Sequence, residues 1–104
     1  MQSRSGQALR LCTGFEWDEA NQAKIMRKHR LQPQDIEPVF FDPQVAVFED
    51  VKHSDQEHRS VVLGKTRDGR LLFVVCTIRH HQIRVISARP AKKDKEVMLY
   101  EKAA

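Results

Sequence analysis

Four arginines stand at or near the ends of three β-rich segments in the second half of the chain. They are Arg59, Arg79, Arg84 and Arg89. A guanidinium stays charged and donates parallel hydrogen bonds to phosphate oxygens, so several guanidiniums around one groove would hold an RNA backbone. The alternative is a solvated sheet edge, where charged side chains prevent aggregation. The pattern alone leaves both interpretations open.

Glu57, His53 and His29 are the groups that could transfer protons beside such an anion site. Attack of a ribose 2′-OH on its own phosphate needs a base for the hydroxyl proton and cations for the developing charge. It also needs an acid for the leaving 5′-oxygen. Spacing does not show that any two of these groups meet. His29 ends a predicted helix, where it can equally cap free carbonyl groups.

The five histidines and two cysteines do not form a metal-binding pattern. The histidines are scattered, and Cys12 and Cys76 lie far apart with no CxxC or Cys/His spacing. Cys76 stands in an apolar run and is interpreted as a core residue. No glycine-rich phosphate loop and no nucleophile motif is present. The sequence therefore predicts no metal, no cofactor and no disulfide, as in a reducing cytoplasm.

Length and charge limit the possible classes of protein. The chain has 104 residues, of which 40% are hydrophobic and 31% charged, typical of a single globular domain. Eighteen Lys and Arg against 14 Asp and Glu give a net charge of +4, which favours a polyanionic partner without requiring one. No apolar run approaches the ~20 residues of a membrane span, so no membrane contact is expected.

Local signals predict the elements that would position these groups. Residues 1–12 are expected to be a disordered leader or tag, and residues 13–104 a single domain. The expected order is a strand at 13–17, a helix at 19–29 capped by Asp18, a short helix from Pro33, a strand at 45–50, three strands, and a helix at 91–102. Asp68-Gly69 marks a hairpin. This is an α+β fold, a small antiparallel meander packed against two N-terminal helices and a C-terminal helix.

The first helix is not cleanly amphipathic. Ala20, Ala23 and Arg27 share one face, and their small side chains suggest close packing against the sheet. Ile25 falls on the other side, with Asn21 and His29. The alanine face is therefore the expected packing face.

The order and spacing of several motifs resemble the BrnT family of type II toxins. These motifs are FEWD, KH at the end of the first helix, DP, HSDQEHR, GRLL, T-x-R, IRVISAR and a C-terminal E-x-x-x-Y, and they cover residues 15–101. The resemblance implies a RelE-like fold and a bacterial ribonuclease toxin. It also implies a BrnA-like antitoxin partner that binds operator DNA as part of the complex.

The resemblance carries over to named positions. Trp17, Gly64 and Ser87 are interpreted as architectural, and the cations as facing RNA. The remaining matches are Asp18, Thr77, Glu96, Tyr100 and the candidate site residues. We expect a metal-independent endoribonuclease with His29, Glu57, Arg59 and Arg79 as catalytic residues and His53 in reserve. The residues expected to bind RNA are Lys24, Lys28, Arg84 and Arg89.

Three positions depart from the family pattern. Asn21 stands where many relatives have Lys, and Ile25 where they have Asn. Arg30 replaces the glycine that usually follows KH, so the helix is expected to end without the usual left-handed residue. These changes fall around the proposed site and bear on nuclease activity more than on the fold.

Other functions remain open. One is a non-catalytic RNA-binding or antitoxin-binding module, a degraded toxin homologue acting in a DNA-binding repressor complex. Base stacking on strand aromatics is poorly supported, because Phe73 is the one aromatic residue in the three C-terminal strands. A surface devoted mainly to protein contact, with the last helix docked on an antitoxin, is compatible with either function.

Overall fold

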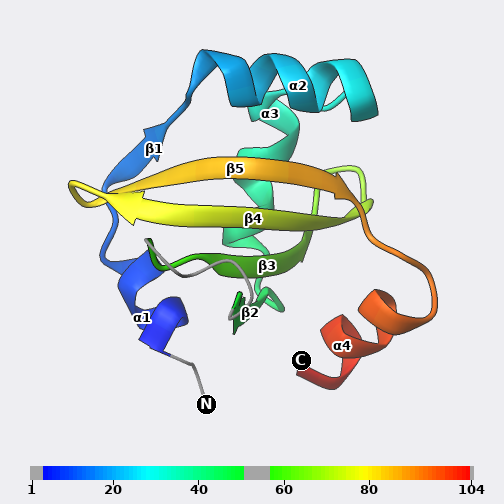
Figure 1. Ribbon diagram of the computed structural model, residues 1–104. Coiled ribbons are helices and arrows are strands. Elements are labelled where there is room, and N and C mark those ends of the chain that lie inside the picture. Colours follow the sequence, from blue (N-terminus) through cyan, green and yellow to red (C-terminus); the bar gives the residue numbers. More distant parts are fainter. Residues whose placement is uncertain (1–3, 51–56, 104) are drawn as a thin grey trace.

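A five-stranded sheet forms the centre of the molecule (Figure 1). The computed structural model describes residues 4–50 and 57–103. The strands are β1 (Gly14–Glu16), β2 (Ala46–Glu49), β3 (Ser60–Lys65), β4 (Leu71–Arg79) and β5 (Gln82–Pro90), in the order β1-β5-β4-β3-β2. Strands β2 to β5 pair antiparallel, as expected. β1 adds a parallel pair with β5, which makes the sheet mixed. The α+β class is confirmed.

Helices cover the two faces of the sheet unequally. They are α1 (Arg4–Arg10), α2 (Glu19–His29), α3 (Pro33–Ile36), the 3-10 helix η1 (Glu37–Phe41) and α4 (Lys95–Ala103). The main core joins α2, α3 and η1 to the sheet through Ile25, Ile36, Val39, Val74 and Val85, among others. A smaller core joins α4 to the other face through Tyr100, Leu63 and Ala46. None of these helices, as far as the chain is described, is long and apolar enough to cross a membrane.

The N-terminal segment corrects an expectation. Residues 1–12 were expected to be disordered, but Arg4–Arg10 form α1. Leu9 and Cys12 pack against the main core, and this burial of apolar surface stabilises the segment in an ordered conformation. Whether the segment is a leader or a tag, and whether the domain starts at residue 13, stays a prediction.

Helix α2 is capped at its N-terminus as expected but packs through the opposite face. The Asp18 carboxylate accepts a hydrogen bond from the Asn21 N–H at 2.9 Å. Ile25 is only 4% exposed, whereas Ala20 and Ala23 are exposed. The expectation that the alanine face packs is therefore wrong. Burying the large Ile25 side chain stabilises the fold more than burying two methyl groups.

The end of α2 is a second correction. Arg30 takes the left-handed conformation itself, with φ 58° and ψ 33°, and its N–H donates to the Met26 carbonyl at 2.9 Å. The helix thus ends through the usual geometry even though glycine is absent. Because Arg30 has a Cβ, this left-handed conformation carries a steric cost that glycine would not have.

Arg30→Gly is expected to raise the free energy of unfolding by about 0.5–1 kcal/mol. Glycine avoids the steric cost of the left-handed region, and its greater freedom in the unfolded chain offsets part of the gain. Urea denaturation measures the change. Ala23→Gly at an exposed helical position serves as the control and should lose about 1 kcal/mol. A less stable Arg30→Gly protein would contradict the expectation.

The second helical segment changes type where proline interrupts it. Pro33 opens α3, and the chain continues as the 3-10 helix η1 because Pro38 has no N–H for an α-helical hydrogen bond. Gly64 of β3 lies directly against η1: a Cβ at this position would stand 2.5 Å from the Val39 carbonyl oxygen. The Trp17 Nε1–H donates to the Glu37 carboxylate at 2.8 Å and ties the start of α2 to η1. Trp17 and Gly64 therefore have structural contacts that agree with an architectural role.

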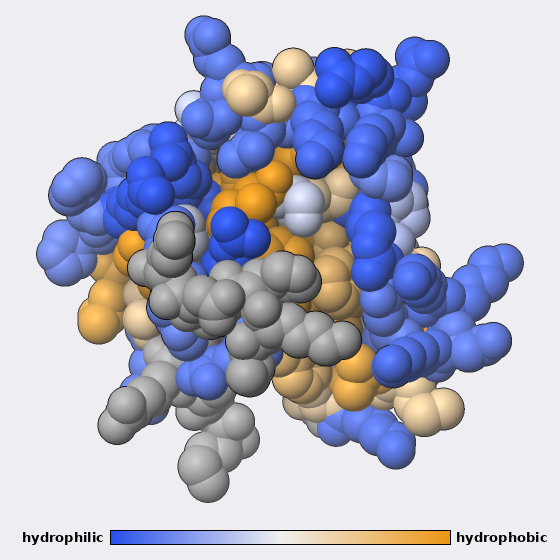
Figure 2. Space-filling view, viewed as in Figure 1, coloured by the Kyte–Doolittle hydropathy of each residue, from blue (hydrophilic) through white to orange (hydrophobic). Residues whose placement is uncertain are grey.

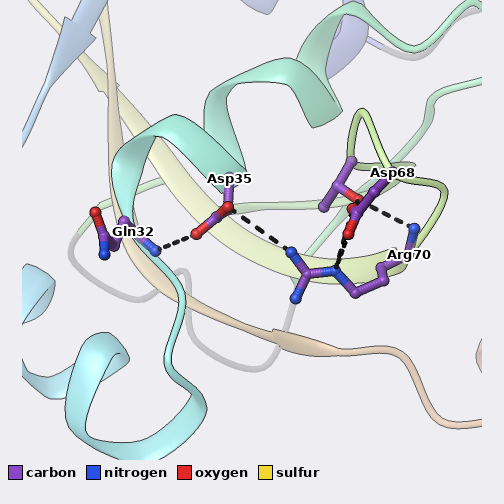
Figure 3. A network of polar contacts seen from close by, with 5 residues as sticks. Gln32, Asp35, Asp68 and Arg70 are labelled. Atoms are coloured by element: carbon purple, nitrogen blue, oxygen red, sulfur yellow. Dashed lines mark hydrogen bonds and ion pairs between the residues drawn. The ribbon is translucent and has the colours of Figure 1, made fainter.

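A polar network fixes the predicted β3–β4 hairpin (Figure 3). Gly69 has φ 87°, and the Arg70 Nε–H donates to both Asp68 carboxylate oxygens at 3.1 and 3.2 Å. The same guanidinium lies 3.7 Å from Asp35 Oδ1, and Asp35 Oδ2 accepts the Gln32 N–H at 2.9 Å. The hairpin is thus attached to the start of α3.

The β4–β5 turn is built from two histidines. His80 and His81 both have positive φ, at 52° and 61°, the conformation that a two-residue hairpin of the primed type requires. The His81 carbonyl accepts a hydrogen bond from the Thr13 N–H at 2.8 Å. The chain just before β1 is therefore attached to this turn.

Helix α4 begins later than expected and docks through a tyrosine. The helix predicted from 91 starts at Lys95, and the Ala91 N–H instead donates to the Leu71 carbonyl at 2.9 Å. The Tyr100 hydroxyl donates to Asp42 Oδ2 at 2.6 Å, and burial together with this bond raises the pKa of Tyr100 to about 12. The same oxygen accepts the Lys65 N–H at 2.8 Å. Asp42 thus joins α4 to β3.

Candidate functional site

Three of the four strand-end arginines gather at one end of the sheet. Arg59 directly precedes β3, Arg79 ends β4, and Arg84 lies near the start of β5. Because β3, β4 and β5 run antiparallel to their neighbours, the three positions meet at the end of the sheet where the β4–β5 turn lies. Glu57, two residues before Arg59, joins the same cluster.

Glu57 and Arg79 form a two-pronged ion pair. Arg79 Nε donates to Glu57 Oε1 at 2.6 Å, and Nη2 donates to Oε2 at 3.2 Å. This bond lowers the pKa of the Glu57 carboxyl below its ordinary value, and the charges of Arg59 and Arg84 act in the same direction. Glu57 is therefore ionised at neutral pH and can accept a proton.

Arg84 lies between two carboxylates from the start of α2. Its Nε is 3.3 Å from Glu16 Oε1, and its Nη2 is 3.6 Å from Asp18 Oδ2. The Arg84 Nε–H is buried and has no hydrogen-bond partner in the described part of the chain. Arg84 is thus held by its charge between Glu16 and Asp18, with its side chain 23% exposed.

Thr77 fixes the backbone beside Glu57. Its hydroxyl donates to the His58 carbonyl at 2.7 Å, which joins β4 to the segment that carries Glu57. Glu57, His58 and Thr77 line a cavity of about 470 Å³, together with Ser60 and Ile78 among others. Thr77 thus positions the carboxylate relative to Arg79 on the same face of β4.

The face of the sheet beside this cluster is not fully covered by helices. Strand alternation places Val61 and Val75 here, opposite the main core, and both are half-buried. Figure 2, seen from the same side as Figure 1, shows hydrophobic surface in the middle of this face with hydrophilic surface around it. The arginines therefore lie beside a partly apolar surface, and Val61 and Val75 have no aromatic ring on which a base could stack.

Arg89 is not part of the cluster. It lies at the other end of β5, where Nη1 and Nη2 donate to the two oxygens of Glu96 at 2.8 and 2.7 Å. Its guanidinium also stacks on the Phe73 ring, 4.1 Å from the centroid. The structure therefore places this predicted RNA-binding residue in a contact between β5 and α4.

Glu96→Gln is expected to lower the free energy of unfolding by about 1–3 kcal/mol at pH 7. Burial alone would raise the pKa of the Glu96 carboxyl, but hydrogen bonds from Arg89 and the Lys92 N–H outweigh it and lower the pKa. A lowered folded pKa means that the pair stabilises the fold above the ordinary value of 4.5 and loses this effect as pH falls through the folded pKa. Urea denaturation at pH 7 and pH 3 should show the difference between wild type and variant shrinking in acid. An equal difference at both pH values would contradict it.

The predicted residues of α2 are separated from the cluster. Asp18, at the start of the helix, contacts Arg84, whereas His29 is its last residue, about 16 Å along the axis for an 11-residue helix. Lys24 and Lys28 are exposed. No contact between these three side chains and Glu57 exists in the ranges 4–50 and 57–103, so the geometry does not bring His29 and Glu57 to one phosphate. His53 lies outside the described residues.

Glu16 is the site residue that sequence reasoning missed. The parallel pairing of β1 and β5 places it opposite Arg84, and pairing between such distant segments has no local signal. The signal in the sequence was the opposite charge of Glu16, on the short strand before a helix, and of Arg84 on a later strand. Within the described ranges, no group of three or more His, Cys, Asp or Glu side chains is arranged to hold a metal ion.

Comparisons with known proteins agree with this architecture. Residues 17–95 match the family model described as ribonuclease toxin, BrnT, of type II toxin-antitoxin system. The crystal structure of the Brucella abortus ribonuclease toxin BrnT is similar, with a TM-score of 0.61, 20% identity, and coverage of 78% of this chain and 99% of that chain. At this identity the likeness shows the fold. Curated protein sequences give no match.

Proposed function

The chain belongs to the BrnT family of ribonuclease toxins of type II toxin-antitoxin systems, and from this premise we propose that it cleaves RNA internally without a metal ion. The observation that carries the proposal is the cluster of Arg59, Arg79 and Arg84 around the ionised Glu57. Family membership supplies the substrate class. The cluster supplies the groups for phosphate binding and proton transfer.

The proposed reaction is attack of a ribose 2′-OH on the adjacent phosphate. Arg79 and Arg84 bind the phosphate oxygens, and their charge, with that of Arg59, stabilises the transition state. Glu57 accepts the proton of the 2′-OH as that oxygen forms a bond to phosphorus. The bond to the 5′-oxygen breaks, which leaves a 2′,3′-cyclic phosphate.

The group that protonates the leaving 5′-oxygen is assigned to solvent water. His29 lies at the far end of α2, and His53 stays a predicted reserve. Without a positioned acid the reaction loses part of the 10²–10⁴-fold gain that such a group gives. A toxin tolerates slow turnover, because it needs to damage only a limited RNA pool.

Partners and location follow from the same proposal. A BrnA-like antitoxin would neutralise the toxin, and operator DNA would be contacted only through the antitoxin complex. With RNA as the substrate, we propose the bacterial cytoplasm as the location. The family description, as a type II toxin-antitoxin system, supports the antitoxin partner.

An RNA digestion with and without EDTA tests the activity. Purified protein is incubated with defined oligoribonucleotides and with the same sequences carrying 2′-deoxyribose. We expect cleavage of the ribose strands at an unchanged rate in EDTA, with cyclic phosphate ends, and no cleavage of the deoxy strands. Cleavage that EDTA abolishes would contradict the metal-free chemistry, and intact RNA would contradict the nuclease activity.

A second candidate function is RNA or antitoxin binding without chemistry. The separation of His29 from Glu57 favours it, because one expected proton donor is absent from the cluster. A mobility shift of intact ribose strands in the same incubation would support this function.

A further inference from the structure

The ion pairs of the candidate site match charge with charge. Among the described residues that interact there, three guanidiniums meet three carboxylates: Arg59, Arg79 and Arg84 against Glu16, Asp18 and Glu57. A simple anion cradle would carry a positive excess. Here carboxylates already stand where a phosphate would be expected.

Two of the carboxylates have little else to hold them in place. Asp18 also caps α2 through its contact with the Asn21 N–H. In the described ranges, by contrast, the Glu57 carboxylate forms its hydrogen bonds and ion pair with Arg79, and Glu16 forms its ion pair with Arg84; the other arginines of the cluster act on them through charge alone. Both are partly exposed, with side-chain exposures of 31% and 37%. These two carboxylates can move away without breaking other bonds.

The two arginines stand at a spacing that suits a strand of RNA. Arg84 pairs with Thr77 in the register of β4 and β5, so Arg79, two residues beyond Thr77, is its diagonal neighbour on the same face. Such diagonal neighbours are about 7–8 Å apart. Long side chains at this spacing reach two neighbouring phosphates of one strand.

We propose that RNA binds by ion-pair exchange, in which two neighbouring phosphates displace Glu57 from Arg79 and Glu16 from Arg84. Glu16 is then a positioning residue, which holds the Arg84 guanidinium in place until substrate arrives. The inference rests on the proposed function for the identity of the anion. It adds that the free protein keeps its own site occupied.

The exchange also changes the base. The Arg79 contact lowers the pKa of Glu57 in the free protein, and transfer of Arg79 to a phosphate removes that effect. The freed carboxylate becomes a stronger base when RNA is bound. Binding of the RNA substrate thus activates Glu57 as the general base.

Binding of a non-cleavable RNA tests the exchange. A fluorescent single-stranded oligonucleotide with 2′-O-methyl groups is titrated with wild type, Glu57→Gln, Glu16→Gln and Glu101→Gln. Glu101 is exposed on α4, so its variant makes the same change in net charge away from the site. We expect both site variants to bind about three- to fivefold more tightly than wild type, because a competing ion pair is gone. Glu101→Gln should stay within about twofold of wild type.

The outcomes separate this inference from the nuclease activity. If either site variant binds no tighter than Glu101→Gln, or if no protein binds the oligonucleotide, the exchange is wrong. Cooperative thermal unfolding of each variant shows that it is folded, and the ¹³C shift of the Glu57 carboxyl in wild type gives a second measurement. Addition of the oligonucleotide should raise the pKa read from that shift, and an unchanged pKa overturns the exchange. Failure of wild type to cut ribose strands would contradict only the proposed activity.

Discussion

Arg79→Ala is expected to lower the rate of RNA cleavage by about 10²–10³-fold, the usual effect of removing one donor that stabilises developing charge. Arg79 is the arginine with a two-pronged contact to Glu57, so it is best placed to hold phosphate beside the base. Its side chain is exposed, so the fold should persist. Single-turnover cleavage of an oligoribonucleotide measures the rate, and expression in bacteria should show relief of growth arrest. Glu57→Ala should relieve the arrest as well.

Two matched variants sharpen this expectation. Arg67→Ala removes an exposed arginine from the β3–β4 hairpin, at the opposite end of the sheet, and should leave cleavage near the wild-type rate. Arg79→Lys keeps the charge but loses the planar fork, so it should fall between wild type and Arg79→Ala. Full toxicity of both Arg79→Ala and Glu57→Ala would place the site elsewhere.

Gly64→Ala is expected to lower the free energy of unfolding by about 3 kcal/mol, at the upper end of the cost of overpacking. The added Cβ would stand 2.5 Å from the Val39 carbonyl oxygen and 2.8 Å from Val39 Cγ1. The oxygen belongs to the backbone of η1, so it cannot be relieved by a change of rotamer. Either η1 shifts from β3 or the strand bends, and both disturb the main core. Urea denaturation followed by circular dichroism measures the loss.

Gly14→Ala is the matched control for this effect. No atom lies within 4 Å of the position that its Cβ would take, so the change should stay within about 0.5 kcal/mol. Gly64→Ala combined with Val39→Ala should remain destabilised, since the backbone clash persists. Equal stability of Gly64→Ala and wild type would show that η1 does not pack this closely.

Local chemistry was enough to predict most elements of the fold. Asp18 as a helix cap, Pro33 at a helix start and Asp68-Gly69 in a hairpin each act through their nearest neighbours, and each is confirmed. The parallel pairing of β1 with β5 was not predictable, because it joins segments almost 70 residues apart. The packing face of α2 was predicted wrongly. The prediction gave more weight to Ala20, Ala23 and Arg27, which share one face, than to Ile25 on the other, and Ile25 is the residue that is buried.

The candidate site was predictable only in part for the same reason. Strand ends showed where Arg59, Arg79 and Arg84 would be, and the antiparallel order of the strands brings them together. The same rule puts Arg89, near the end of β5, at the opposite end of the sheet, so its grouping with the RNA-binding residues did not follow from strand order. Glu16 required the β1–β5 pairing. Arg30 was expected to avoid the left-handed region, yet it adopts it and closes the last turn of α2 through its N–H.

The paired arginines also bear on which anions the site accepts. A free phosphate or a mononucleotide carries one anionic centre, and it would have to open an ion pair for a single new contact. A polynucleotide brings its second phosphate at a high effective concentration once the first is bound, so two exchanges reinforce each other. Because binding would depend on the number of linked phosphates, the site would stay free of abundant small phosphates and bind a polynucleotide strand.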